Sequence, residues 1–219
     1  MRTVIATLAM LCLPALSYAQ AEPRAYVSGA GGFATTSEGT SGDVLAEAGV
    51  RFAPNLFVFG NVGKFNNLAP TTFQPDADAI AADFAASGVV LDASTTVPAW
   101  YSIGGVRFMI PVRMAHMVPY VFGGAGFAHL MPSARFVYSS GTLPGASPAP
   151  GDDVTAELVS LGEVTPPSSS NAFMFSAGGG VDVPLSPRVG LNVGYRLSRV
   201  NADTPLTAQG VTFGVGYRF

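Results

Sequence analysis

The feature that most constrains this chain is alternation, in stretches of about ten residues, between apolar side chains and small or polar ones. The segment 209–219, QGVTFGVGYRF, shows it clearly. From Val211 to Phe219 every odd position is Val, Phe or Tyr, and every even position is Thr, Gly or Arg. Because side chains in a β-strand point alternately to opposite faces, the segment is predicted to be a strand with one wholly apolar face.

The composition indicates where such faces are buried. Only 11% of the residues are charged, while 48% are hydrophobic, and typical globular chains carry roughly 25% charged residues. Beyond residue 21, no apolar run reaches the roughly 20 residues that a transmembrane helix needs. Lipid requires every backbone polar group to be paired within the protein, which leaves a closed β-barrel as the predicted fold.

Alternation predicts eight strands, most of them long enough to cross a bilayer when tilted. They cover residues 24–33, 43–52, 55–65, 98–110, 117–130, 172–185, 188–200 and 209–219. Short joins ("AP", "PVRMAH", "SP") alternate with longer ones at 34–42, 66–97, 131–171 and 201–208. This pattern is typical of an all-β, eight-stranded antiparallel up-and-down transmembrane β-barrel with short periplasmic turns and long extracellular loops.

Residues 1–21 have the features of a secretory signal peptide: a positive start, an apolar stretch and small residues at the cleavage site. We expect cleavage after Ala19 or Ala21, which leaves one barrel domain over residues 22–219. Cys12, the single cysteine, lies in the leader, so we expect no disulfide or thiolate chemistry in the domain.

The predicted outer loops are acidic, whereas most arginines lie in strands and short turns. In segment 76–88, Ile80 and Phe84 have helical spacing, which predicts a short amphipathic helix capping one rim. The sequence predicts no particular conformation for the rest of loops 66–97 and 131–171. The acidic balance disfavours nucleic-acid binding. The loop carboxylates are Glu38, Asp76, Asp78, Asp83, Asp92, Asp152, Asp153, Glu157, Glu163 and Asp203.

When the aromatic faces point to lipid, several charged side chains point into the barrel. An eight-stranded barrel is just wide enough to be filled by its own side chains, and buried ions must pair. We therefore predict an Arg–carboxylate network that plugs the lumen, with a lined conduction path as the alternative. The predicted network consists of Glu47, Arg51, Arg107, Asp182 and Arg196, with Arg218 as a further candidate.

Three segments carry a resemblance to a known family: PYVFGGAGFAH (119–129), GGGVDVPLSPRVGLNVGYRL (178–197) and the terminal VGYRF. They resemble the outer-membrane β-barrel domain family, the small barrels related to outer-membrane protein A and the opacity-type porins. The resemblance implies the outer membrane of a Gram-negative-type bacterium, with outer-membrane lipid and lipopolysaccharide as partners. The acidic outer loops predict a host or cell-surface ligand as a further partner. The resemblance also implies that Tyr217 and Phe219 form a signal read by the barrel assembly machinery.

The sequence favours a non-enzymatic structural or surface-interaction protein acting through its acidic loops. A narrow porin-like channel for small solutes is the alternative, followed by an outer-leaflet lipid-modifying enzyme that would use His129 with Ser133. His116 and His129 are the only histidines. Neither has a nearby acidic partner, so we predict no metal site and no cofactor.

Overall fold

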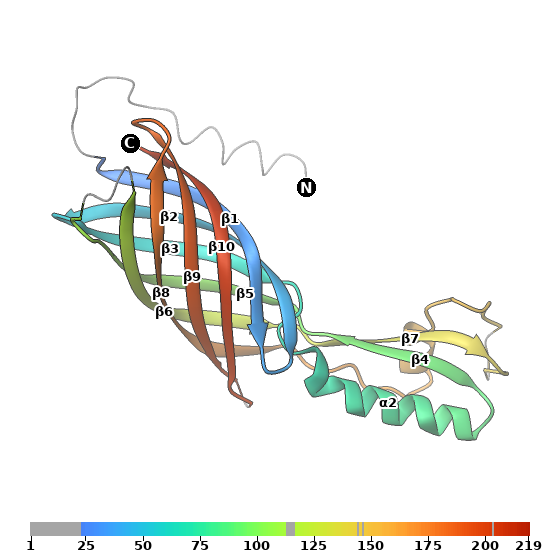
Figure 1. Cartoon of the computed structure of the whole chain (residues 1–219). Coiled ribbons are helices and arrows are strands. Elements are labelled where there is room, and N and C mark those ends of the chain that lie inside the picture. Colours follow the sequence, from blue (N-terminus) through green and yellow to red (C-terminus); the bar gives the residue numbers. More distant parts are fainter. Residues whose placement is uncertain (1–22, 113–116, 144, 146, 203) are drawn as a thin grey trace.

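The computed structural model describes residues 23–112, 117–143, 145, 147–202 and 204–219, and its main body is a closed barrel (Figure 1). The barrel has eight antiparallel strands in the order β1-β10-β9-β8-β6-β5-β3-β2. The predicted signal peptide and His116 lie outside the described residues. The barrel strands are β1 (Ala25–Thr36), β2 (Gly39–Ala53), β3 (Leu56–Phe65), β5 (Ala99–Met109), β6 (Val118–Leu130), β8 (Ser170–Pro184), β9 (Val189–Asn201) and β10 (Leu206–Arg218).

These are the eight predicted segments, so the eight-stranded antiparallel barrel is confirmed. Two of the four expected long loops are nevertheless short. β1 and β2 are joined by Ser37 and Glu38 alone, and β9 and β10 by residues 202–205. The strands continue through polar residues, as in the register pair Thr35 and Thr40, and these strand ends lack the apolar face on which the prediction depends.

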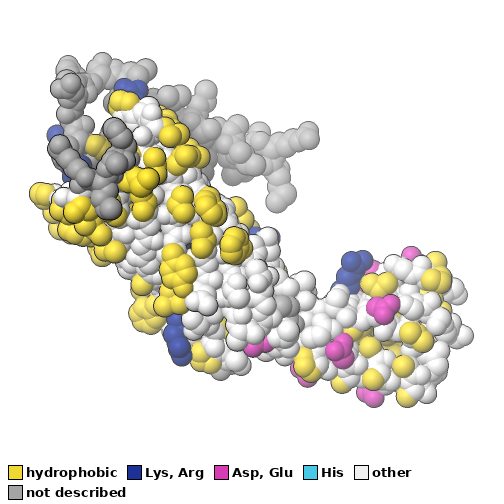
Figure 2. Space-filling view, viewed as in Figure 1, with side chains coloured by type: hydrophobic (Ala, Val, Ile, Leu, Met, Phe, Trp, Pro, Cys, Tyr) yellow, Lys and Arg dark blue, Asp and Glu magenta, His cyan; other side chains and the backbone are white. Residues whose placement is uncertain are grey.

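The outer face of the barrel is apolar, as the alternation predicts. Along β10, Phe213, Val215 and Tyr217 are exposed, while the side chain of Thr212, on the opposite face of the strand, is buried. Figure 2 shows hydrophobic side chains spread over the barrel surface. None of the helices in the described part of the chain is long and apolar enough to cross a membrane.

The two long loops fold together into a structure that we call the extension, residues 66–98 and 131–169. It contains α2 (Pro70–Ala86), β4 (Val90–Thr96), β7 (Ser133–Ser140) and α3 (Thr155–Ser160), with β4 and β7 paired antiparallel. The extension projects from the end of the barrel opposite to that at which β10 finishes (Figure 1). Its own apolar core includes Phe136, Leu143, Val154 and Leu158.

The expected helix exists, but its predicted placement as a rim cap is wrong. It begins at residue 70 and lies along β4. Its start meets the end of the barrel, where Phe73 packs against the apolar layer and Thr71 Oγ1 donates to the Glu38 carbonyl at 3.5 Å. Gln74 fixes this position. Its side-chain amide donates to the carbonyl of Ala93 at 3.0 Å and accepts from the Thr95 amide at 3.1 Å. These hydrogen bonds between Gln74 and the edge of β4 could not form if the helix lay across the rim of the barrel.

Candidate functional site

The centre of the lumen contains a buried carboxylate with three donors. Arg107 Nη2 lies 2.6 Å from Glu47 Oε1. The Tyr26 hydroxyl donates to the same oxygen at 2.7 Å, and Asn61 Nδ2 donates to Oε2 at 3.4 Å. The Arg107 guanidinium also lies over the rings of Tyr26 and Tyr120, at 5.0 and 4.3 Å from their centroids. The ion pair is thus enclosed by hydrogen bonds and aromatic faces.

A second carboxylate, Asp182, lies closer to the short-turn end. Arg218 Nη2 is 3.3 Å from Asp182 Oδ2, and Asn192 Nδ2 donates to Oδ1 at 3.1 Å. The Tyr120 hydroxyl donates to Asn192 Oδ1 at 2.9 Å. Because the ring of Tyr120 also lies beneath Arg107, this tyrosine joins the two ion pairs.

Arg196 belongs to a third group, with a residue that the sequence reasoning missed. Its Nη1 donates to the Tyr101 hydroxyl at 3.0 Å, and that hydroxyl donates to Asp43 Oδ1 at 2.8 Å. Asp43 is buried and follows the same odd-numbered alternation that places Glu47 inside. Continuing the alternation of the predicted strand 43–52 from Glu47 back to its first residue would have placed Asp43 in the lumen.

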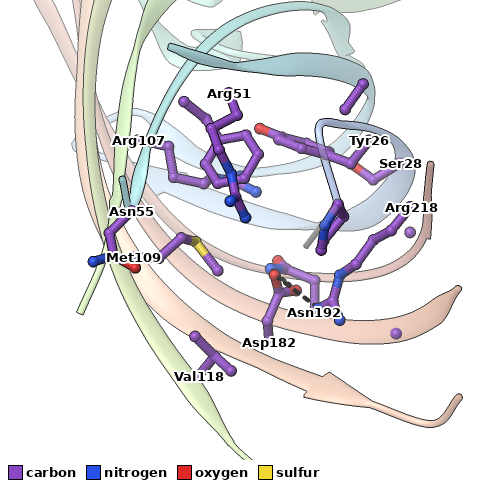
Figure 3. Close-up of a pocket in the computed structure, with 15 residues that line it drawn as sticks. Tyr26, Ser28, Arg51, Asn55, Arg107, Met109, Val118, Asp182, Asn192 and Arg218 are labelled. Carbon is purple, nitrogen blue, oxygen red and sulfur yellow. Dashed lines mark hydrogen bonds and ion pairs between the residues drawn. The ribbon is translucent and has the colours of Figure 1, made fainter. Parts of the chain in front are cut away.

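At the short-turn end, the lumen contains a cavity of about 270 Å³ next to these ion pairs. Arg51, Arg107, Asp182 and Arg218 all line it and come from four different strands (Figure 3). Arg51 lies with its guanidinium 5.5 Å from the centre of the Phe57 ring. The predicted interior residues therefore share this half of the lumen, except Arg196, which lies deeper. Their role as a plug stays a prediction.

The opposite, long-loop end of the lumen is filled by apolar side chains. Met174 and Val200 are fully buried there, and so is Leu68 at the base of the extension. Leu68 donates its amide to the Val97 carbonyl at 2.8 Å, which ties the two ends of the first long loop together over the mouth. This apolar layer also includes Phe65, Ala99, Ala128, Leu130, Ala172, Leu206 and Ala208.

The residues considered for hydrolysis do not meet. His129 Nδ1 lies 2.8 Å from Asn171 Oδ1, whereas Ser133 Oγ lies 2.9 Å from Thr96 Oγ1 in the extension. Each predicted partner therefore has another neighbour. Within the described ranges, no group of three His, Cys, Asp or Glu side chains is placed to hold a metal ion.

The extension carries most of the acidic groups, visible as the magenta patches in Figure 2. Asp153 accepts hydrogen bonds from the hydroxyl and the amide of Thr155, and Arg135 Nε lies 2.9 Å from its Oδ2. These bonds with Thr155, and then the Arg135 guanidinium, hold the pKa of Asp153 below its usual range. The carboxylate is therefore ionised at neutral pH and links Arg135 on β7 to Thr155 at the start of α3.

A closed barrel with an apolar outer face and a polar, ion-paired interior defines an integral outer-membrane β-barrel protein. The sequence model of the family described as "Outer membrane protein beta-barrel domain" matches residues 3–219. The chain belongs to this family, which confirms the resemblance found in the sequence and the location in a Gram-negative-type outer membrane.

Solved structures with the same fold are distant in sequence. Neisserial surface protein A is 16% identical, with 89% of this chain and 96% of that chain covered and a TM-score of 0.50. A major outer membrane protein from Thermus thermophilus is 14% identical, with 89% and 99% covered and a TM-score of 0.57. At these identities the likeness shows the fold alone. No curated protein matches the sequence.

Proposed function

We propose that this protein is a closed, non-enzymatic barrel that presents the acidic extension as a binding surface outside the cell. The observation that carries the proposal is the extension's own core. Phe136 and Leu158 are fully buried within it, and this core is distinct from the apolar layer of the barrel. A connection that only joined strands would need no such core, whereas a binding surface has to be held in one shape.

The charge of the extension indicates the chemistry of its partner. Asp76, Asp83 and Glu157 are exposed on α2 and α3, and the one basic residue in the sequence of the extension, Arg135, is paired with Asp153. Electrostatic complementarity accelerates encounter with a surface of opposite charge and disfavours one of like charge. We therefore expect a partner with a basic surface.

The channel alternative is disfavoured by the apolar layer at the long-loop end. A conducting path would have to pass between Met174, Val200 and Leu68, all without exposed surface. Folded protein inserted in a planar bilayer should therefore show no discrete conductance steps. Reproducible steps would contradict a closed barrel and would make the cavity at the periplasmic end part of a pore.

The binding proposal can be tested on cells that display the protein. Adhesion to a polylysine surface should exceed adhesion to a polyglutamate surface, and a variant with Asp76→Asn, Asp83→Asn and Glu157→Gln should lose this preference. The variant Ala79→Asn changes an exposed, uncharged position of α2 and serves as the control. Equal adhesion of the triple variant and the wild type, at equal surface levels, would refute the proposal.

A further inference from the structure

The cavity at the short-turn end of the lumen reaches the rim of the barrel. Its lining includes Pro23, which precedes β1, and Arg218, with which β10 ends. Its inner wall includes Arg107, the cation of the central ion pair. Short turns of outer-membrane barrels lie on the periplasmic side. A solute in the periplasm therefore has access to this cavity without crossing the membrane.

Positive charge exceeds negative charge around the cavity. Arg51, Arg107 and Arg218 line it, and Asp182 is the one carboxylate among the described residues of its lining. Adding Glu47, which pairs with Arg107 at 2.6 Å, gives three guanidiniums and two carboxylates, an excess of one positive charge. A charge excess in a partly desolvated cavity favours entry of the opposite charge. The cavity thus has the electrostatic character of a site for a monoanion.

Two of the arginines approach the cavity from either side of one strand. Arg51 on β2 and Arg218 on β10 flank β1, which lies between their strands. The Arg51 amide donates to the Arg24 carbonyl at 2.7 Å, and Arg218 is in register with Tyr26, two residues further along the chain. Both side chains point into the cavity (Figure 3). Because a guanidinium presents a planar fork of N–H donors, the two arginines are suited to bind the two oxygens of one carboxylate.

An apolar wall adjoins these arginines. Phe57, Met109, Val118 and the ring of Tyr26 line the same cavity. The rings of Tyr26 and Phe57 meet edge to face with their centroids 5.6 Å apart, and the Arg51 guanidinium lies 5.5 Å from the Phe57 centroid. At about 270 Å³ the cavity is larger than the roughly 150 Å³ that holds a benzene molecule in an engineered protein cavity. It therefore has room for an apolar ring together with a carboxylate.

We propose that this cavity binds a small monocarboxylate with one apolar ring, drawn from the periplasm. Arg51 and Arg218 bind the carboxylate, and Phe57 and Met109 contact the ring. In the described part of the chain, Arg218 contacts Asp182 through Nη2 at 3.3 Å, so the other N–H groups of its fork serve the ligand. The inference depends on the outer-membrane orientation of the barrel and is independent of what the extension binds.

The charge and the apolar wall together favour this ligand over other small molecules. Inorganic phosphate would contact the arginines alone and would gain nothing from Phe57 and Met109. An aromatic ammonium would fill the same space but would add to the positive excess. An uncharged aromatic alcohol would lack the charge-assisted hydrogen bonds to the arginines, which are about twice as strong as neutral ones. An aromatic carboxylate uses both parts of the cavity.

Fluorine NMR of small aromatic probes tests the site directly. Folded protein in phosphatidylcholine nanodiscs is titrated into para-fluorobenzoate, with empty nanodiscs as the blank, and line broadening is recorded. We expect saturable broadening of para-fluorobenzoate and none of para-fluorobenzylamine, and an equal concentration of inorganic phosphate should not reverse the broadening. Arg51→Gln should weaken binding about tenfold, because it removes a charge-assisted contact. Ser28→Leu keeps every charge, fills part of the cavity and should abolish binding.

Arg188→Gln is the matched control, since Arg188 is exposed in the turn between β8 and β9, at the same end of the barrel, and does not line the cavity. It should leave probe binding unchanged. Equal broadening of the two probes, reversal by phosphate, or no saturable broadening with the wild type would overturn the proposal. So would wild-type affinity of either Arg51→Gln or Ser28→Leu, or an equal effect of Arg188→Gln. Heat-resistant migration of each variant confirms folding. The adhesion test uses different residues and a different probe, so the two proposals fail separately.

Discussion

Arg107 and Glu47 meet at 2.6 Å across the lumen although their strands, β5 and β2, are separated by β3. Both side chains are almost fully buried, with exposed fractions of 9% and 3%. Each ion is therefore stable inside the barrel because the other is present, and the pair links strands that share no backbone hydrogen bonds.

Removing one member of this pair should destabilise the barrel strongly. Arg107→Met leaves the Glu47 carboxylate buried without its cation, which should cost about 3–5 kcal/mol. The double variant Glu47→Gln with Arg107→Met removes both charges and should recover most of that loss. Urea-induced unfolding from lipid vesicles measures both free energies. A double variant as unstable as Arg107→Met would show that the charge pair is not the cause.

Truncating the apolar layer at the extracellular mouth should also destabilise the barrel. Met174→Ala leaves a cavity that neither lipid nor neighbouring side chains can fill, at a cost of about 2–5 kcal/mol. Leu197→Ala is the control, because Leu197 faces outward and acyl chains can refill the space. The same unfolding measurement should give a smaller loss for Leu197→Ala. Equal losses would argue against a tightly packed seal.

The extension should unfold while the barrel stays folded when a side chain in the apolar core of the extension is truncated. Leu158 on α3 is fully buried, so Leu158→Ala should loosen the extension and expose residues 131–169 to protease. Heat-resistant migration of the barrel should stay unchanged, because the two cores are separate. Leu161→Ala alters an exposed neighbour and should leave the protease pattern as in the wild type. Joint loss of barrel and extension would contradict independent cores.

The assembly role of Tyr217 and Phe219 stays a prediction. The ring centroids of Tyr217, near the end of β10, and of Phe219, which follows the strand, are 5.0 Å apart. Phe219→Ala should lower the amount of folded protein in the outer membrane several-fold if this pair is recognised during assembly. Phe213→Ala removes another exposed ring of the same strand and should have a weaker effect. Quantifying heat-resistant protein in membrane fractions compares the two, and equal effects would exclude a specific signal.

Much of the barrel could be predicted because alternation is a local property. A period of two assigns each side chain to the lumen or to lipid whatever the strand pairs with. This places Phe213 outside and Glu47, Arg107 and Asp182 inside from the sequence alone. The ends of strands were harder to predict, since polar residues beyond the membrane, such as Thr35, continue the ladder without an apolar signal.

The sequence by itself determined the number of barrel strands, their faces and most of the charged residues of the lumen. Only the tertiary structure decided which groups meet: Arg107 with Glu47 across β3, and Arg196 with Asp43 through Tyr101. It also decided that the two long loops form one extension, because β4 pairs with β7 more than thirty residues away. Such contacts depend on register and barrel closure, and both are set by hydrogen bonds between strands that no local pattern encodes.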